Sequence, residues 1–379
     1  MRLPVFLFAI AALVCISSIQ PLSAHAQEGT SVEQVYIKKS VVLDLVESST
    51  EVHPWTGLSS PTQTITVKVL EGPEKGREAT FENNSPTQVE EGEIIYTRHG
   101  FGGFDPETWY VSDPYRLNVL MWVGIVFVVL LFIFGGLQGI RGLASLVGSL
   151  ILIFYILIPN IYNGHSPILV SISVASLIIV VGSYITHGFN RTTTLAMLGM
   201  ILTVIVTGIA TYFVIHAAQL TGYTGEENAY LMFNTGGRID MIGLLFGGIM
   251  IGLLGILYDI AIGQAVTVEE LVAAGKHYTR TQVLARAMRI GREHIGALVN
   301  TLAIAYVGAS LPLLLLFQNA EAGSILHIIN SELFATEIVR ILMGSIGLVI
   351  AVPITTTLAA YLLHGREIQH SIGHKGHSH

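Results

Sequence analysis

The sequence divides into a polar amino-terminal stretch and a long apolar remainder. Seven apolar runs are long enough, or nearly so, to cross a bilayer as helices. They lie near residues 118–138, 143–159, 167–186, 193–217, 240–262, 296–318 and 338–363. Residues 27–115 instead show β-branched, alternating runs separated by Gly, Pro and Asn. The pattern predicts an α-helical polytopic membrane protein with about seven transmembrane helices and a small amino-terminal β-domain, which we expect to be a compact antiparallel barrel.

Composition supports the bilayer as the main solvent, because 51% of the 379 residues are hydrophobic and only 12% are charged. Residues 1–26 resemble a secretory signal, with Arg2, an apolar run and the small-residue site Ala24-His25-Ala26. An uncleaved anchor is the alternative. The one cysteine, Cys15, lies in this segment. A cleaved chain would have no cysteine, which excludes disulfides and thiolate metal sites.

Charge predicts how the chain is oriented. Residues 27–115 contain six Lys or Arg against fifteen Asp or Glu, so this domain is acidic and unsuited to nucleic acid. If it is exported, the connections expected in the cytoplasm and the tail contain nine Lys or Arg, against Arg238 alone in the outer loops. The positive-inside rule then places the mature amino end outside and the carboxyl end inside.

Several segments together resemble the YibE/F-like family of bacterial membrane proteins. They are "DPYR" (113–116), "GGLQGIRGLASLVGSL" (135–150), "PNIYNGHSP" (159–167), "GLLGILYDIAI" (252–262), "GREHIGALVNTLAIAYVGASLPLLLL" (291–316) and "EIVRILMGSIGLVIAVPIT" (337–355). The resemblance implies a multi-pass protein of a bacterial inner membrane, with an exported amino-terminal domain. It implies no reaction, and the His-rich end "HSIGHKGHSH" is not part of it.

Polar residues recur at a similar depth in three of the predicted spans. On the expected orientation, Asp259, then Asn300 and Thr301, then Pro353 with Thr355, Thr356 and Thr357 all lie toward the cytoplasmic side of spans five, six and seven. An ionisable side chain or a proline inside a span is tolerated mainly beside a cavity or a water path. These residues are therefore our candidates for a transport or coupling site.

The position of Asp259 also permits simpler interpretations. Near a helix end, its carboxylate could reach solvent or pair with Arg292, and it could equally serve folding specificity. Outer-side gate candidates are His165, in a turn between two prolines, and Glu337 with Arg340, whose spacing favours a local ion pair.

Two cytoplasmic segments complete the predicted organisation. The loop 264–295 has an amphipathic second half that we expect to lie on the membrane surface. The tail 365–379 contains His370, His374, His377 and His379, which could bind a divalent transition metal or form a tail without a defined site.

The sequence contains no motif of an intramembrane hydrolase and no Walker motif, so we expect neither an enzyme nor a cofactor. Domains 1–26, 27–115 and 116–364 then allow two functions. One is a permease with a polar cavity near the cytoplasmic side of spans five to seven. The other is a membrane scaffold or regulator whose exported β-domain binds a partner or an envelope component. Either could act with a partner membrane subunit or as a homo-oligomer.

Overall fold

The computed structural model describes residues 36–52, 59–83, 87–102, 105–275, 277–318 and 325–364. The chain forms two compact units. One holds the described residues up to Phe134, and the other holds those from Gly135 onward. The expected signal segment and the His-rich tail lie outside the described residues.

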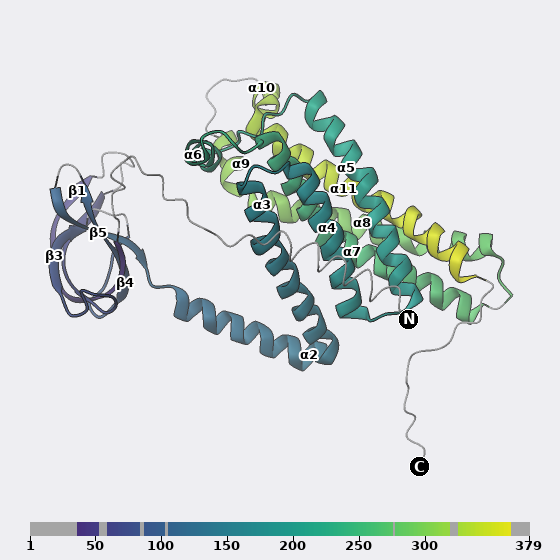
Figure 1. Ribbon diagram of the computed structural model, residues 1–379, viewed down its shortest axis with the longest axis horizontal. Helices are drawn as coiled ribbons and strands as arrows, with labels where there is room; N and C mark the ends of the chain where they lie inside the picture. The colour runs from purple at the N-terminus through teal and green to yellow at the C-terminus, as the bar shows by residue number, and fades with distance from the viewer. Residues whose placement is uncertain are drawn as a thin grey trace, which may run out of the picture. The chain divides into compact units, whose positions relative to one another are not determined.

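The first unit contains a five-stranded antiparallel sheet that curls on itself (Figure 1). Its strands are β1 (Tyr36–Val52), β2 (Ser59–Val69), β3 (Glu78–Asn83), β4 (Ile94–Gly102) and β5 (Asp105–Pro114), in the order β3-β2-β1-β4-β5. The first four strands contain the alternating runs that predicted them. The fifth has no such run, since its prolines and acidic residues weaken the strand pattern at both ends.

The curled sheet buries its core on the inner face. Val42, Ile65, Val67 and Ile95 are almost fully buried there. The two edge strands approach each other where the rings of Phe81 and Trp109 stack, with centroids 6.3 Å apart. The sheet therefore curls until its two edge strands meet, although no backbone pairing joins β3 and β5 among the described residues.

The inner face also holds a buried charge at Lys38, whose ammonium pairs with Glu74. Glu74 accepts a second bond from Arg77 at 3.0 Å, and both cations lie over the Trp109 ring. Burial, followed by repulsion from Arg77, lowers the pKa of the Lys38 ammonium. A polar cluster thus covers part of the apolar core.

The rest of the chain is helical. Its elements are α2 (Leu117–Leu152), the short π-helix η1 (Ile153–Leu157), α3 (Ile158–Tyr162), α4 (Pro167–His187), α5 (Arg191–Ala217), α6 (Glu226–Thr235), α7 (Met241–Ala274), α8 (Arg280–Ala309), α9 (Leu311–Gln318), α10 (Ile325–Asn330) and α11 (Glu332–Leu363). Most of the predicted apolar runs are contained in these helices.

Five helical segments of the described chain are long and apolar enough to cross a membrane. They are Leu117–Tyr162, Pro167–His187, Arg191–Ala217, Met241–Ala274 and Glu332–Leu363. The first holds both predicted spans 118–138 and 143–159, with a break at Gly136, whose φ of 53° suits a residue without a Cβ. The predicted sixth span falls on α8 and α9, which are not among the five because α8 begins with a charged half.

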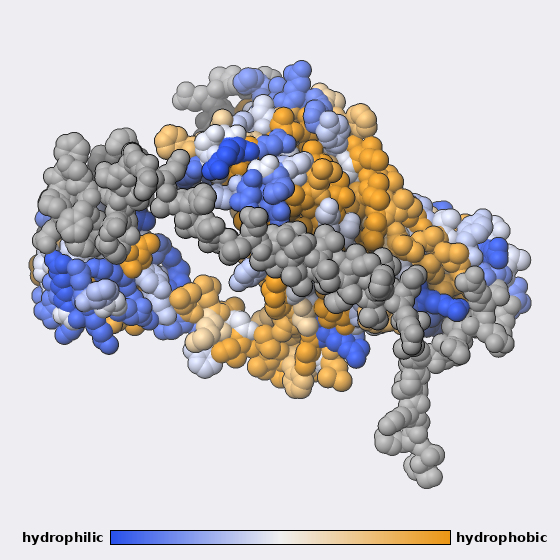
Figure 2. All heavy atoms as spheres, viewed as in Figure 1, coloured by the Kyte–Doolittle hydropathy of each residue, from blue (hydrophilic) through white to orange (hydrophobic). Residues whose placement is uncertain are grey.

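The helical unit is organised around α7. Phe246, Met250, Leu253 and Leu257 of this helix are buried by α4, α5 and α11. Apolar side chains also cover the outside of the helices, whereas the described surface of the sheet is mainly hydrophilic (Figure 2). A core combined with an apolar exterior is typical of helices solvated by lipid.

Residues 264–295 differ from the surface-lying loop that we expected. Helix α7 continues to Ala274, and α8 starts at a capping box in which Thr279 and Gln282 bond reciprocally. The stripe of Val283, Ala287 and Gly291 is buried by protein, since the ends of α7 and α11 pack on it. The amphipathic pattern therefore does belong to a helix, but the apolar face of this helix packs against other helices.

Candidate functional site

Two polar side chains meet in the buried contact between α7 and α11. Gln264 and Thr356 are both 0% exposed, and Thr356 Oγ1 donates to Gln264 Oε1 at 2.9 Å. The same hydroxyl lies 2.6 Å from Val352 O, so its single proton is shared between two acceptors. Span seven therefore does bring a polar group to span five, where it meets Gln264 and not Asp259.

Helix α8 reaches this contact through a glycine. A Cβ on Gly291 would lie 2.6 Å from Val352 Cγ1 and 3.0 Å from both polar atoms of the Gln264 amide. Only a residue without a side chain allows such an approach. The predicted convergence of three helices is present, but the contribution of α8 is a glycine backbone and not Asn300 or Thr301.

A second buried hydroxyl, that of Thr355, faces α5. A Cβ on Gly199 would come within 2.5 Å of Thr355 Oγ1, so α5 and α11 are also in close contact. Among the described residues, neither Thr355 nor Thr207 of α5 has a hydrogen-bond partner for its hydroxyl. Burying an unpaired hydroxyl costs free energy, so we expect the packing of α5 against α11 to be sensitive to substitution.

The remaining coupling candidates lie on exposed surface. These are Asp259, Asn300, Thr301, Pro353 and Thr357. Thr301 donates its hydroxyl to Ala297 O at 3.0 Å within its own helix. Helix α11 continues through Pro353 without ending. Asp259 has no hydrogen bond or ion pair with any described residue, including Arg292.

The three gate candidates do not form a single cluster. Glu337 and Arg340 make the expected ion pair at 3.4 Å, and Glu337 also accepts a bond from Ser310 at the end of α8. His165 bonds Asn160 O within its own turn. The described residues contain no group of three metal-ligating side chains, and the four tail histidines lie outside them.

A cavity of about 760 Å³ lies between α2, α4 and α7, with no contribution from α11. Its volume is within the range of small-molecule sites. The lining residues are Gly142, Ser145, Leu146, Ser149, Leu150 and Ile153 from α2 and η1; Ile178, Gly182, Thr186 and His187 from α4; and Ile251, Leu254, Gly255, Tyr258, Asp259, Ile262 and Gly263 from α7. Of the predicted site residues, only Asp259 belongs to it.

The cavity lies where the second half of α2 makes only a few close contacts with α4. Gln138 donates to Thr186 O at 3.2 Å, and a Cβ on Gly182 would come within 2.8 Å of Ser145 Oγ. Beyond the cavity, Leu157 and Ile161 are buried against α4. Between these contacts α2 has no buried residue, which leaves space beside α4 and α7.

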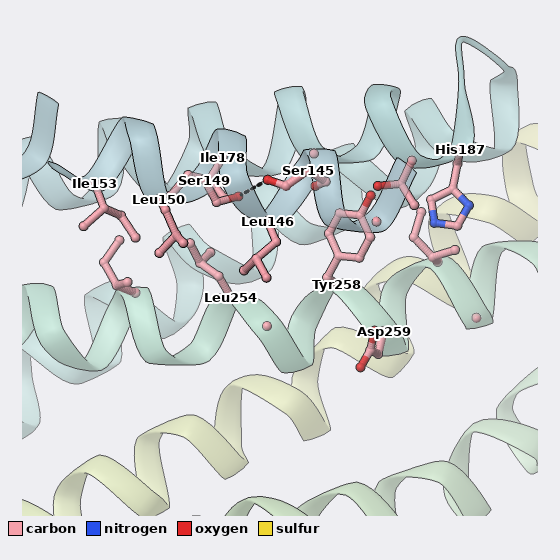
Figure 3. A pocket seen from close by; sticks show the side chains of 17 residues that line it. Ser145, Leu146, Ser149, Leu150, Ile153, Ile178, His187, Leu254, Tyr258 and Asp259 are labelled. Atoms are coloured by element: carbon pink, nitrogen blue, oxygen red, sulfur yellow. Dashed lines mark hydrogen bonds between the residues drawn. The ribbon is translucent and has the colours of Figure 1, made fainter. Parts of the chain in front are cut away.

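The cavity is polar at one end and apolar at the other (Figure 3). Ile153, Leu150 and Leu254 line the apolar end, whereas Tyr258 and His187 lie at the polar end, with ring centroids 5.9 Å apart. The Tyr258 ring points from α7 toward α2 and α4, whereas the Asp259 carboxylate points to the opposite side of α7.

The polar end contains buried hydroxyls. The Thr186 side chain lines the cavity and is only 8% exposed. Neither its hydroxyl nor that of Tyr258 makes a hydrogen bond of standard geometry with the described residues, but the hydroxyls of Thr186 and Ser183 lie close enough to that of Tyr258 to interact with it. These groups therefore form a small polar cluster beside the cavity.

Sequence reasoning missed the residues that matter most here. Gln264 lies just past the predicted end of span five, but it is flanked by apolar residues on both sides, which could have marked it as buried. Ser145 and Ser149 are four residues apart on one face of a helix, and this spacing was the available signal for the cavity.

Long apolar helices packed through glycines, with an apolar exterior, define a polytopic helical membrane protein. Within that class, the chain belongs to the YibE/F-like family, whose description, YibE/F-like protein, is matched over residues 123–365. This match confirms the resemblance noted in the sequence and covers most of the helical unit. No curated protein and no solved structure matches the chain significantly.

Proposed function

We propose that the protein is a permease whose substrate path includes the cavity between α2, α4 and α7. The observation that carries this proposal is a cavity of about 760 Å³ with polar side chains at one end and apolar side chains at the other. Cavities of this size with a few polar groups are typical of small-molecule sites. The sequence predicted a cavity among spans five, six and seven. The proposal places the cavity instead among the predicted spans two, three and five, and it includes no enzymatic activity.

Asp259 keeps its place in this proposal as the coupling group. Asp259 contributes to the rim of the cavity, and its carboxylate, which has no partner among the described residues, points away from Tyr258. A charge within a candidate span tends to be functional, since insertion scales assign it a cost of up to about 2.5–3.5 kcal/mol. Titration or cation binding at this rim would link an ion gradient to the occupancy of the cavity.

The proposed topology has seven crossings, with the β-domain exported and the carboxyl end in the cytoplasm of a bacterium. The break at Gly136 supports counting the first apolar segment twice, because its 46 residues exceed twice the helical length that a bilayer requires. Asn300 and Thr301 of α8 have exposed polar side chains, which are available for contact with a partner membrane subunit or a second copy.

A pair of glycine substitutions on α7 tests the permease. Gly255 lines the cavity and Gly248 does not, and neither has an atom within 4 Å of the position that a Cβ would occupy. Gly255→Phe should fill the cavity, whereas Gly248→Phe should add the same bulk to an exposed face seven residues away. Membrane vesicles with matched amounts of each protein would be loaded with cell extract, and the compounds retained would be compared by mass spectrometry.

We expect at least one compound to redistribute with wild type and Gly248→Phe but not with Gly255→Phe. Full redistribution with Gly255→Phe would remove the cavity from the path. If no compound depends on the wild-type protein, the permease proposal is wrong.

One observation favours the alternative, a regulator whose β-domain binds an envelope component. The Lys39 ammonium lies 3.9 Å from the centre of the Tyr115 ring, which in turn lies 5.6 Å from that of Tyr96. Rings of this kind, apolar in body and polar at the tip, are common at interfaces. If deletion of residues 27–112 abolishes a cellular phenotype while vesicle transport persists, this function would be supported beside the first.

A further inference from the structure

Helix α8 packs against the other described helices mainly on one side. On that side it contacts α7 and α11, and Leu302 is buried against Gly344 of α11. The side opposite Leu302 is exposed, and its residues recur at alternating steps of four and three. They are Glu293, Ala297, Asn300, Ile304 and Val307, which we call the outer face of α8. This spacing is typical of two helices that pair along their length.

Asn300 is a polar residue in the middle of the outer face. On α8 it lies between Gly291, which is close to Gln264 of α7, and Tyr306, whose hydroxyl is close to Gly252 of α7. Asn300 is therefore at the depth of the segment between Gly252 and Gln264, inside the candidate span Met241–Ala274. Its side chain is exposed and forms no hydrogen bond with a described residue.

An unpaired amide at this depth favours a partner helix over lipid. Lipid tails offer no hydrogen bonds, whereas Asn side chains in membrane proteins commonly bond across helices. An amide has both donors and an acceptor, so it can pair with an identical amide. In parallel helix pairs, one Asn among apolar contact residues also fixes the alignment of the two helices.

A second copy of the chain matches the outer face by symmetry. Copies in one membrane share an orientation, so a two-fold axis along the membrane normal places the two α8 helices parallel and at the same depth. Each Asn300 then faces the other Asn300. A different protein would need its own polar group at this depth.

The charges at the start of the outer face are also self-complementary. Glu293 lies beside Arg292 and one turn after Arg289, and all three side chains are exposed. None of them forms an ion pair with a described residue. Glu293 of one copy can therefore pair with an arginine of the other, which offsets the repulsion between the two glutamates.

Glycines on both sides of the outer face allow the two helices to approach. Gly296 and Gly308 flank Asn300, and no atom lies within 4 Å of the position that a Cβ would occupy on either. Small residues of this kind let helix backbones come close in membranes.

We propose that two copies of the protein pair in parallel through the outer face of α8, with the two Asn300 amides bonded to each other. Glu293 of each copy pairs with Arg289 or Arg292 of the other. The inference goes beyond the proposed function, because no residue of α8 lines the cavity.

Cysteine cross-linking in native membranes tests the pair. Two differently tagged full-length copies with Cys15→Ser both carry Ile304→Cys on the outer face. The matched control is Ile205→Cys, because Ile205 is 44% exposed on α5 and its neighbour Thr207 lies at the depth of Leu253 of α7. A lipid-soluble oxidant is added, and disulfide-linked dimers are identified by the presence of both tags.

We expect Ile304→Cys to form dimers with both tags and Ile205→Cys to remain monomeric. Purified copies labelled for energy transfer then give the dissociation constant at several protein-to-lipid ratios. Asn300→Leu should raise this constant about tenfold, which corresponds to about 1.4 kcal/mol. Gly308→Leu should also raise it, since the added bulk keeps the helices apart. Gly248→Leu, on an exposed face of α7, should leave it unchanged.

Equal cross-linking of Ile304→Cys and Ile205→Cys would indicate random collision and overturn the pair. If Ile304→Cys stays monomeric, or joins a different protein, a second copy does not cover the outer face. A dissociation constant that neither Asn300→Leu nor Gly308→Leu changes would overturn the assigned contact. Each of these results would leave the permease proposal standing, because the cavity is unaltered.

Discussion

The hydroxyl of Thr356 meets the amide of Gln264 at 2.9 Å in an interface that is otherwise apolar. The two partners are not equivalent, because Thr356 retains its bond to Val352 O if the amide is removed, whereas the Gln264 amide loses its bond to Thr356 if the hydroxyl is removed. A buried amide without a partner costs about 1–3 kcal/mol.

Thr356→Val should therefore lower the free energy of unfolding by about 1–3 kcal/mol, and Gln264→Leu should change it much less. Thermal unfolding in detergent, followed by circular dichroism, measures both. The double variant should recover most of the loss, because no unpaired amide remains. Equal losses in the two single variants would show that the interaction is symmetric, contrary to this account.

The approach of α8 through Gly291 makes a second prediction. Gly291→Ala should destabilise the helical unit by about 1–3 kcal/mol, since the added methyl would overlap Val352 and Gln264. Gly296→Ala on the same helix is the control, because no atom lies within 4 Å of its Cβ position. That control should be neutral or gain up to about 1 kcal/mol from helix propensity. A stable Gly291→Ala variant would mean that the helices can move apart at little cost.

Asp259 should be dispensable for folding. Asp259→Asn removes no hydrogen bond or ion pair with a described residue, so its unfolding temperature should stay close to that of wild type, as for most exposed substitutions within about 0.5 kcal/mol. Redistribution of the compound identified in vesicles should nevertheless fail. Asn300→Ala, also exposed but outside the cavity, should remain active. Wild-type activity in Asp259→Asn would end the coupling proposal.

Lys38 should make the stability of the β-domain depend on alkaline pH. Its pKa is lowered in the folded state, so the unfolded chain binds more protons between that value and about 10.4. The free energy of unfolding should rise with pH in this window, and Lys38→Met should reduce the rise while Arg77 keeps Glu74 paired.

Lys39 gives the opposite sign and serves as the control. A hydrogen bond with Tyr115 raises its pKa, so its contribution is present below about 10.4 and is lost as pH rises through the raised value. Lys39→Met should therefore steepen the rise. Unfolding of the full-length protein followed by tryptophan fluorescence compares the variants. Identical pH profiles would contradict the assignment of both groups.

Topology is tested by a reporter fused after His379, which should be active in the cytoplasm. We expect this result because Lys and Arg are concentrated near the expected inner ends of the spans. A reporter inserted after Gly225, in the connection between α5 and α7, should be active on the opposite side. Activity of both reporters on one side would change the number of crossings between them.

Local sequence patterns predicted the helices and strands better than they predicted which of these elements pack together. Period-two runs gave four of the five strands, and long apolar runs marked the helices of the bundle. Hydropathy could not separate Asp259 from Gln264, because the face that a helix buries depends on its neighbours. The sequence did not predict the cavity either, because the cavity depends on the distance of α2 from α4 and α7.

The stacking of Phe81 on Trp109 has a consequence for proteins crowded on one membrane. An open sheet presents unpaired backbone groups along its edge strands, onto which a neighbouring copy can add its own strand. Here the edge strands β3 and β5 approach each other, and β3 has only six residues. Neighbouring copies of the domain, concentrated in two dimensions by their membrane anchors, would therefore have little edge to join and could stay separate.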